Sequence, residues 1–253
     1  MREGPRPELR LDSVAESLFG ELVVRYPRDQ AERAEAAAAL VEVLKPVVGR
    51  YLGADWSGAL RLELLETARV GGANPVTGTL RHALRGFDER SPRAAGALSY
   101  ELGRVLLYRS SREGVFPGGG PRHPDWLLEA ALLPLRHVWD DRAAWLDAVA
   151  EQVKLFTWRK PLAEPLLRDF SRLNPRQRVV ASAQCLLRGQ TLARYHPDWI
   201  RSWRRRLADE PTLDGEAALE DVTGTSSAAW EEHFADDLQL STDTLRGTSP
   251  LDW

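Results

Sequence analysis

The sequence is poor in cysteine and lysine, and it lacks any long apolar run. A single cysteine, Cys185, occurs among 253 residues, so no internal disulfide can form and the chain fits a reducing compartment. No stretch approaches the ~18 consecutive apolar residues that a membrane-spanning helix needs. The first residues are charged and contain proline, unlike a secretion signal. These absences predict a cytoplasmic protein that does not enter a membrane.

Lysine is replaced almost entirely by arginine. Only three lysines accompany 31 arginines. We interpret this bias as the mark of a GC-rich genome, which indicates a bacterial source. It also weakens any inference that arginine was chosen at a given position for its forked guanidinium group.

The motifs of familiar catalytic and metal sites are missing as well. His-Glu-x-x-His and Gly-x-Ser-x-Gly do not occur. None of the five histidines has a glutamate three residues before it, as ferritin-type metal sites require. Cys185 lies in an apolar helical run and is expected to be structural. We therefore predict no catalytic residue, no metal site and no cofactor.

Alternating runs of β-branched residues are nearly absent, whereas long apolar residues recur at helical spacing almost throughout. Several prolines stand at expected helix starts, where their missing N–H costs nothing. We therefore predict an all-α fold, an irregular bundle of about ten to twelve helices. The expected helices cover residues 13–25, 29–52, 57–69, 79–86, 92–108, 124–137, 141–157, 161–172, 175–194, 197–208, 214–222 and 227–239.

The longest irregular segment is rich in glycine and proline and covers residues 111–123. We interpret it as a hinge or a mobile loop between two lobes. The predicted units are an N-terminal helical lobe at 1–110, a C-terminal helical lobe at 124–208, and an acidic segment with a tail at 209–253.

Charge is sorted along the chain. Residues 168–206, the basic segment, contain ten arginines and two acids, whereas the 47 residues that follow contain twelve acids and one arginine. Arginines beside aromatic side chains are what a surface needs to follow phosphates and stack on bases. The predicted nucleic-acid-binding residues are Arg176, Arg178, Arg194, Trp199, Arg201, Trp203, Arg204, Arg205 and Arg206.

Two other interpretations account for the same residues. In the first, the tryptophans belong to the core and the arginines form the solvated face of their helix. In the second, the basic segment pairs with the acidic segment of the same chain. The sequence leaves all three interpretations open.

The acidic segment contains an amphipathic stretch and an apolar end. Trp230 and Phe234 are four residues apart, which places them on one side of a helix over residues 226–240. The chain then ends with Leu251 and Trp253 near its terminus. We predict that these four apolar residues bind a protein partner. The alternative is that Trp253 packs back onto the domain.

Together these patterns favour a non-catalytic interaction protein, an accessory subunit of a nucleic-acid-handling assembly. It would contact nucleic acid or another polyanion through the basic segment and a protein through the acidic tail. One alternative is a protein-only scaffold or oligomeric adaptor. Another is a helical enzyme that acts on an anionic substrate near Arg122 and His123, where a glycine-rich loop leads into a helix N-terminus.

Overall fold

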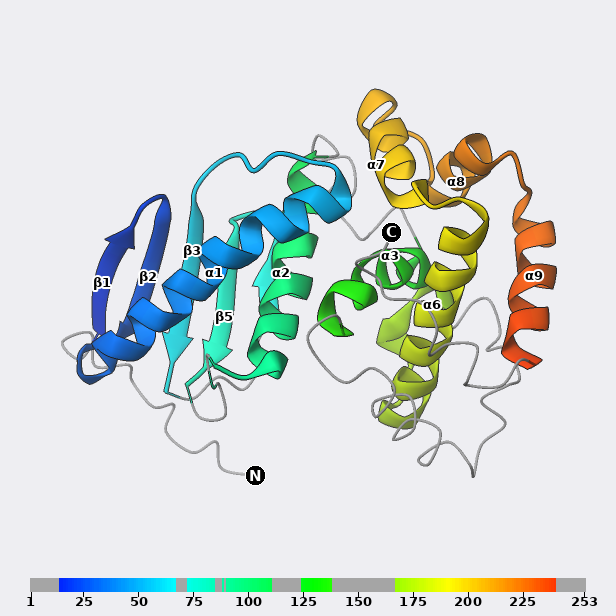
Figure 1. The fold of residues 1–253 in the computed structure, drawn as a ribbon. Helices are drawn as coiled ribbons and strands as arrows, with labels where there is room; N and C mark the ends of the chain where they lie inside the picture. Colours follow the sequence, from blue (N-terminus) through cyan, green and yellow to red (C-terminus); the bar gives the residue numbers. More distant parts are fainter. Residues whose placement is uncertain are drawn as a thin grey trace, which may run out of the picture.

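The computed structural model describes residues 14–66, 72–84, 88, 90–110, 124–137 and 167–239. Within these residues the chain forms a five-stranded mixed sheet and seven α-helices (Figure 1). The sheet with its two covering helices makes up one half of the molecule, and the remaining helices make up the other half. The fold is therefore of the α/β class, and the prediction of an all-α bundle of ten to twelve helices was wrong.

The sheet has the strand order β1-β2-β3-β5-β4. Its central strands β2, β3 and β5 are parallel, and the two edge strands pair antiparallel to their neighbours. A crossover helix, α1, connects β2 to β3, and β4 and β5 form a hairpin. The strands are β1 (Val14–Phe19), β2 (Leu22–Pro27), β3 (Leu60–Leu65), β4 (Gly72–Asn74) and β5 (Thr79–Ala83).

The sheet occupies three segments that were predicted to be helical, 13–25, 57–69 and 79–86. In the first segment the chain reverses at Gly20, whose φ of 59° suits the first position of a two-residue hairpin turn. In β3 every second residue faces the core, and Leu60, Leu62 and Leu64 are buried. A leucine-rich strand of six residues is too short for its period of two to stand out against a helical pattern.

Seven helices were predicted to within two residues of their ends. Among them, α6 begins at Pro175 after an Asn174–Gln177 capping box, which satisfies two backbone N–H groups reciprocally. The helices are α1 (Ala31–Leu52), α2 (Pro92–Ser110), α3 (Asp125–His137), α6 (Pro175–Tyr195), α7 (Trp199–Asp209), α8 (Gly215–Thr223) and α9 (Ser227–Gln239). The helix expected over 141–157 lies outside the described residues, as does most of the one expected over 161–172.

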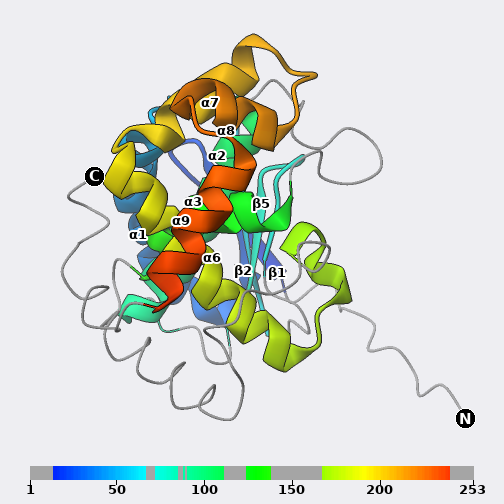
Figure 2. The same cartoon turned by 90° about the vertical axis from the view of Figure 1, so that its right-hand side faces the viewer.

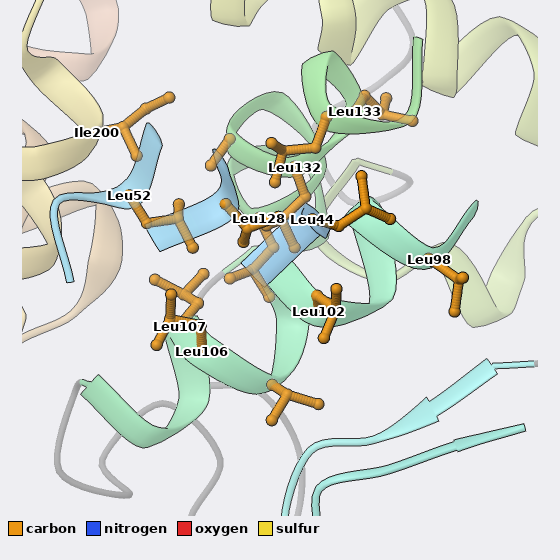
Figure 3. Close-up of a cluster of buried hydrophobic side chains, with 14 of the residues drawn as sticks. Leu44, Leu52, Leu98, Leu102, Leu106, Leu107, Leu128, Leu132, Leu133 and Ile200 are labelled. Carbon is orange, nitrogen blue, oxygen red and sulfur yellow. The ribbon is translucent and has the colours of Figure 1, made fainter. Parts of the chain in front are cut away.

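One continuous hydrophobic core joins the two halves of the described chain. It begins on the face of the sheet that α1 and α2 cover and continues through α3 to α6, α7, α8 and α9. Figure 3 shows the junction, where leucines of α1, α2 and α3 meet Ile200 of α7. Seen from the side, α9 lies along α6 (Figure 2). The predicted division at residues 111–123 stays a prediction, because these residues lie outside the described part.

Among the described residues, every helix is too short or too polar to cross a membrane.

Candidate functional site

The two tryptophans of α7 lie inside the core. Trp199 and Trp203 are 1% and 0% exposed, and their ring centroids are 6.2 Å apart. The Trp203 indole N–H donates to the carbonyl of Gly215, at the start of α8, over 2.9 Å. Both rings therefore serve the packing of α7, and neither face is open to a nucleic-acid base.

Two arginines of α7 bind the C-terminal end of α1. Arg204 donates from Nε to the carbonyl of Leu52 at 3.0 Å and from Nη2 to that of Gly53 at 2.6 Å. Arg201 donates to the carbonyl of Arg50 at 3.0 Å. The last carbonyls of a helix have no partner within it and carry its negative dipole end, so cations are favoured there. Burial lowers the pKa of Arg204. These two side chains cap α1.

Arginines at both ends of the basic segment are tied to α8. Arg206, near the end of α7, bonds the carboxylates of Glu210 at 2.7 Å and Asp221 at 2.9 Å. Arg168 forms an ion pair with Glu216 in the first turn of α8. Acidic side chains of residues 209–239 thus form ion pairs with arginines of the basic segment.

The most buried of the described arginines, Arg188 of α6, is 3% exposed. It makes two hydrogen bonds to the Glu231 carboxylate, of 2.5 and 2.9 Å. Its guanidinium carbon also lies 5.0 Å from the ring centroid of Trp126 and 4.6 Å from that of Phe234. A planar guanidinium satisfies a carboxylate at its edge and aromatic rings at its faces, so Arg188 joins α3, α6 and α9.

A second contact holds α9 against α6. The carboxylate of Asp237, which is 8% exposed, accepts a hydrogen bond from Arg194 at 2.9 Å and another from the hydroxyl of Thr191. Trp230 and Phe234 of α9 are 2% and 1% exposed and stack on each other. The amphipathic face that was predicted to bind a partner therefore packs against the same chain.

Replacing Asp237 with alanine is expected to lower the free energy of unfolding by roughly 1–3 kcal/mol, since it removes the carboxylate acceptor of the buried Thr191 hydroxyl and the ion-pair partner of Arg194. The matched control is Asp236→Ala, because Asp236 is the exposed neighbour on the same helix. The control should change stability by less than about 0.5 kcal/mol. Urea denaturation measures both, and amide hydrogen exchange should show α9 opening more often in the first variant. Equal losses in the two variants would contradict the assigned contact.

Of the nine arginines in the basic segment whose side chains the structure describes, six form ion pairs, and four of these six use acids of residues 209–239. Arg178 donates to the Leu173 carbonyl at 3.3 Å, and Arg205 is exposed. The structure therefore agrees, for those four arginines, with the interpretation that the basic and acidic segments pair. The six are Arg168, Arg172, Arg188, Arg194, Arg201 and Arg206.

Several predicted residues cannot be placed. Arg122, His123, Leu251 and Trp253 lie outside the described residues, and the side chain of Arg176 does too. The anion site proposed for the loop and the partner site proposed for the chain end stay predictions.

A polar cluster that was not predicted lies between α2 and α3. The Tyr100 hydroxyl donates to the Glu129 carboxylate, and one turn earlier Asp125 accepts from the Phe170 N–H at 2.6 Å. Burial raises the pKa of Glu129 and also that of Asp125, against the opposing field of Arg104. The signal was present as Asp125 and Glu129 four residues apart on one helical face. It was missed because the surrounding leucines dominate the pattern.

The raised pKa of Glu129 gives a pH-dependent prediction. When the pKa of a carboxyl is higher in the folded state than in the unfolded state, its contribution to stability is full below the unfolded-state pKa. This contribution is lost as the pH rises through the folded-state pKa, because the charged form is disfavoured in the folded state. We expect the stability of Glu129→Gln, which keeps an acceptor for Tyr100 without the charge, to increase relative to the natural chain as the pH rises from about 4, near the ordinary pKa of glutamate, to neutral. Urea midpoints across this range measure the difference, with exposed Glu32→Gln as the control. A difference that does not change with pH would contradict the burial effect.

The outer face of the sheet, defined as the side opposite α1 and α2, carries a row of alternating charges. Glu16 of β1 pairs in register with Arg25 of β2, Arg25 with Glu63 of β3, and Glu63 with Arg81 of β5. Neighbours in this row attract one another, and the Arg81–Glu63 ion pair measures 2.7 Å. Opposite charges on adjacent strands stabilise their pairing. Arg61, one register step away, also pairs with Glu16 at 3.5 Å.

The outer face is open to solvent at several points. The side chains of Glu16 and Arg81 are 52% and 51% exposed. Leu18 is 71% exposed and lies beside Val23 of β2. Parallel strands normally have both faces covered, yet the described helices cover only the inner face. The outer face is therefore the candidate interaction surface, and it was missed because no strand was predicted.

Within the described part of the chain, no group of three or more His, Cys, Asp or Glu side chains is arranged to hold a metal ion. Neither a protein-family model nor a curated protein matches the sequence.

Proposed function

We propose that this chain is a non-catalytic protein-interaction module, a scaffold or adaptor that contacts its partner through the outer face of its sheet. One observation carries the proposal. The parallel strands β2, β3 and β5 are covered by described helices on one face only, and the opposite face carries an in-register row of charges beside the exposed side chain of Leu18.

The residue types of the outer face support binding of a protein surface. A sheet face that packs under its own helices is apolar, whereas this face alternates Glu16, Arg25, Glu63 and Arg81. Charges in a fixed pattern give orientation and discriminate between partners, because a mismatched pattern places like charges together. The apolar side chain of Leu18 at the edge adds area that a partner would remove from water.

The state of the basic segment favours a protein partner over nucleic acid. Contact with phosphates would require arginines such as Arg188 and Arg206 to exchange carboxylate partners that they already have within the chain. Arg201 and Arg204 are likewise engaged with carbonyls at the end of α1. Little free positive charge is left along the described parts of α6 and α7 to release counterions from a nucleic acid.

The proposal is tested by co-expressing a tagged chain with an untagged copy in bacterial cells and identifying what the tagged chain captures. Three baits are compared: the natural chain, Leu18→Lys on the outer face, and Val43→Lys on the solvent side of α1. Val43 is 62% exposed, so it matches Leu18 in exposure and chemistry. We expect the first and third baits to capture the same proteins and Leu18→Lys to lose at least one of them. Identical captures by all three baits would contradict the proposal.

A further inference from the structure

We propose that the partner of the outer face is a second copy of this chain, docked face to face about a two-fold axis parallel to the strands. This inference rests on the proposed function, because it names the partner of the same surface. It follows from the order of charges across the sheet, which is acid, base, acid, base from β1 to β5.

The charge row is complementary to itself when its direction is reversed. If the axis passes between β2 and β3, the row of the second copy runs opposite to that of the first. Glu16 then lies opposite Arg81 of the second copy, and Arg25 lies opposite Glu63. Because the contact is isologous, each pair occurs twice. The in-chain ion pairs Arg81–Glu63 and Arg61–Glu16 are kept, and each row charge gains an opposite charge on the second copy.

The other face-to-face arrangement is disfavoured by the same row. A two-fold axis that is perpendicular to the strands and runs along the row would set each residue of the row against its own equivalent. Glu16 would then face Glu16, and Arg81 would face Arg81, so that like charges meet at every position. Like charges placed together across an interface cost several kcal/mol. The sequence of charges thus selects one orientation of the second copy.

The neighbouring row of the outer face is compatible with this orientation. It consists of Leu18, Val23, Arg61 and Thr79, which are also paired in register across β1, β2, β3 and β5. The same axis sets Leu18 opposite Thr79 of the second copy and Val23 opposite the aliphatic stem of Arg61. The exposed side chain of Leu18 would be covered by a small side chain, without an opposing charge.

The area of the outer face determines how strong the proposed dimer should be. Strands of about six residues with a rise of about 3.3 Å, in a sheet of strands about 4.8 Å apart, give a face of roughly 20 by 20 Å. Two such faces bury at most roughly 800 Å² in total, because Glu63 and Thr79 are already buried within each chain, and this area is below the size of stable complexes. The dimer should therefore be weak, with a dissociation constant on the order of 10 µM or higher. Because the outer pair of the contact, Glu16 and Arg81, is half exposed, the dimer should become weaker at high salt.

Sedimentation equilibrium over a range of concentrations at low salt tests the inference through two single charge reversals. Glu16→Arg places two arginines opposite each other in each dimer contact, and Arg81→Glu does the same with two glutamates. Each variant alone should self-associate at least tenfold more weakly than the natural chain. In an equimolar mixture, the two reversed side chains meet each other as an opposite-charge pair and the remaining natural pair is kept, so association should return. Glu32→Arg, a reversal on α1, should leave self-association unchanged.

Rescue by mixing cannot come from variants that fail to fold, and thermal unfolding of each single variant checks this independently. If both variants fold and the mixture stays monomeric, the proposed orientation is wrong. If the natural chain is monomeric throughout but Leu18→Lys loses another captured protein, the second copy is not the partner and the proposed function still holds. If Leu18→Lys loses nothing at all, both the proposed function and this inference fail.

Discussion

Replacing Gly189 with alanine is expected to lower the free energy of unfolding by roughly 3 kcal/mol or more, although alanine is the better helix former. A Cβ atom at this position of α6 would lie 2.4 Å from the carbonyl oxygen of Ala130 and 3.2 Å from its carbonyl carbon. Both are backbone atoms of α3 and cannot rotate away. The two helices would have to separate, which would open the packing along the core.

Gly103→Ala in α2 is the matched control. There an added Cβ would meet the ends of two flexible side chains, at 2.7 Å from Leu135 Cδ1 and 2.9 Å from Leu132 Cδ2. Rotation of those side chains should absorb much of the overlap, so we expect less than about half the loss seen for Gly189→Ala. Urea denaturation of the two variants measures the difference. If Gly189→Ala were as stable as the natural chain, α3 and α6 could not approach as closely as described.

Trp203→Ala should also destabilise the chain strongly, by roughly 3–5 kcal/mol. The side chain is fully buried, and its removal leaves a cavity beneath α7 together with the unpaired carbonyl of Gly215. Trp203→Phe keeps most of the volume and loses only the hydrogen bond, so we expect a smaller loss of roughly 1–3 kcal/mol. Tyr195→Ala removes an aromatic side chain that is half exposed, and it serves as the surface control.

The outcome for Trp203 separates its two interpretations. As a core residue, Trp203 controls stability, measured by thermal or urea unfolding. As a base-stacking residue, it would control nucleic-acid affinity with little effect on stability. If Trp203→Ala folds as stably as the natural chain, its placement in the core is wrong.

The helices were predictable because their signals are local. The capping box of Asn174 and Gln177, followed by apolar residues three and four apart, identifies α6 without knowledge of its neighbours. The strands were not predictable in the same way. Leu60, Leu62, Leu64 and Leu65 crowd one short stretch, and the choice between strand and helix depends on pairing with β2 and β5, which are distant in sequence.

The candidate sites show the same limit: their local patterns could be read from the sequence, but their contacts between distant segments could not. The sorting of arginines and acids along the chain is visible in the sequence, but the partner of each arginine depends on packing. Arg188 meets Glu231 only because α9 returns along α6. Glu16 and Arg81 lie in one row of the outer face only because four strands pair in a particular register. No local pattern contains that information.

The pairing of the arginines with acids of the same chain is tested most directly by titrating fluorescent single-stranded DNA with the full chain across a salt series. Since most of the basic segment is already engaged, we expect no saturable change in anisotropy at physiological salt. The contradicting result is saturable binding that weakens steeply with salt. If several free cations contact phosphates, a plot of the logarithm of the binding constant against the logarithm of salt concentration should have a slope steeper than about −3. Loss of that binding in Arg205→Gln would then place the contact on α7.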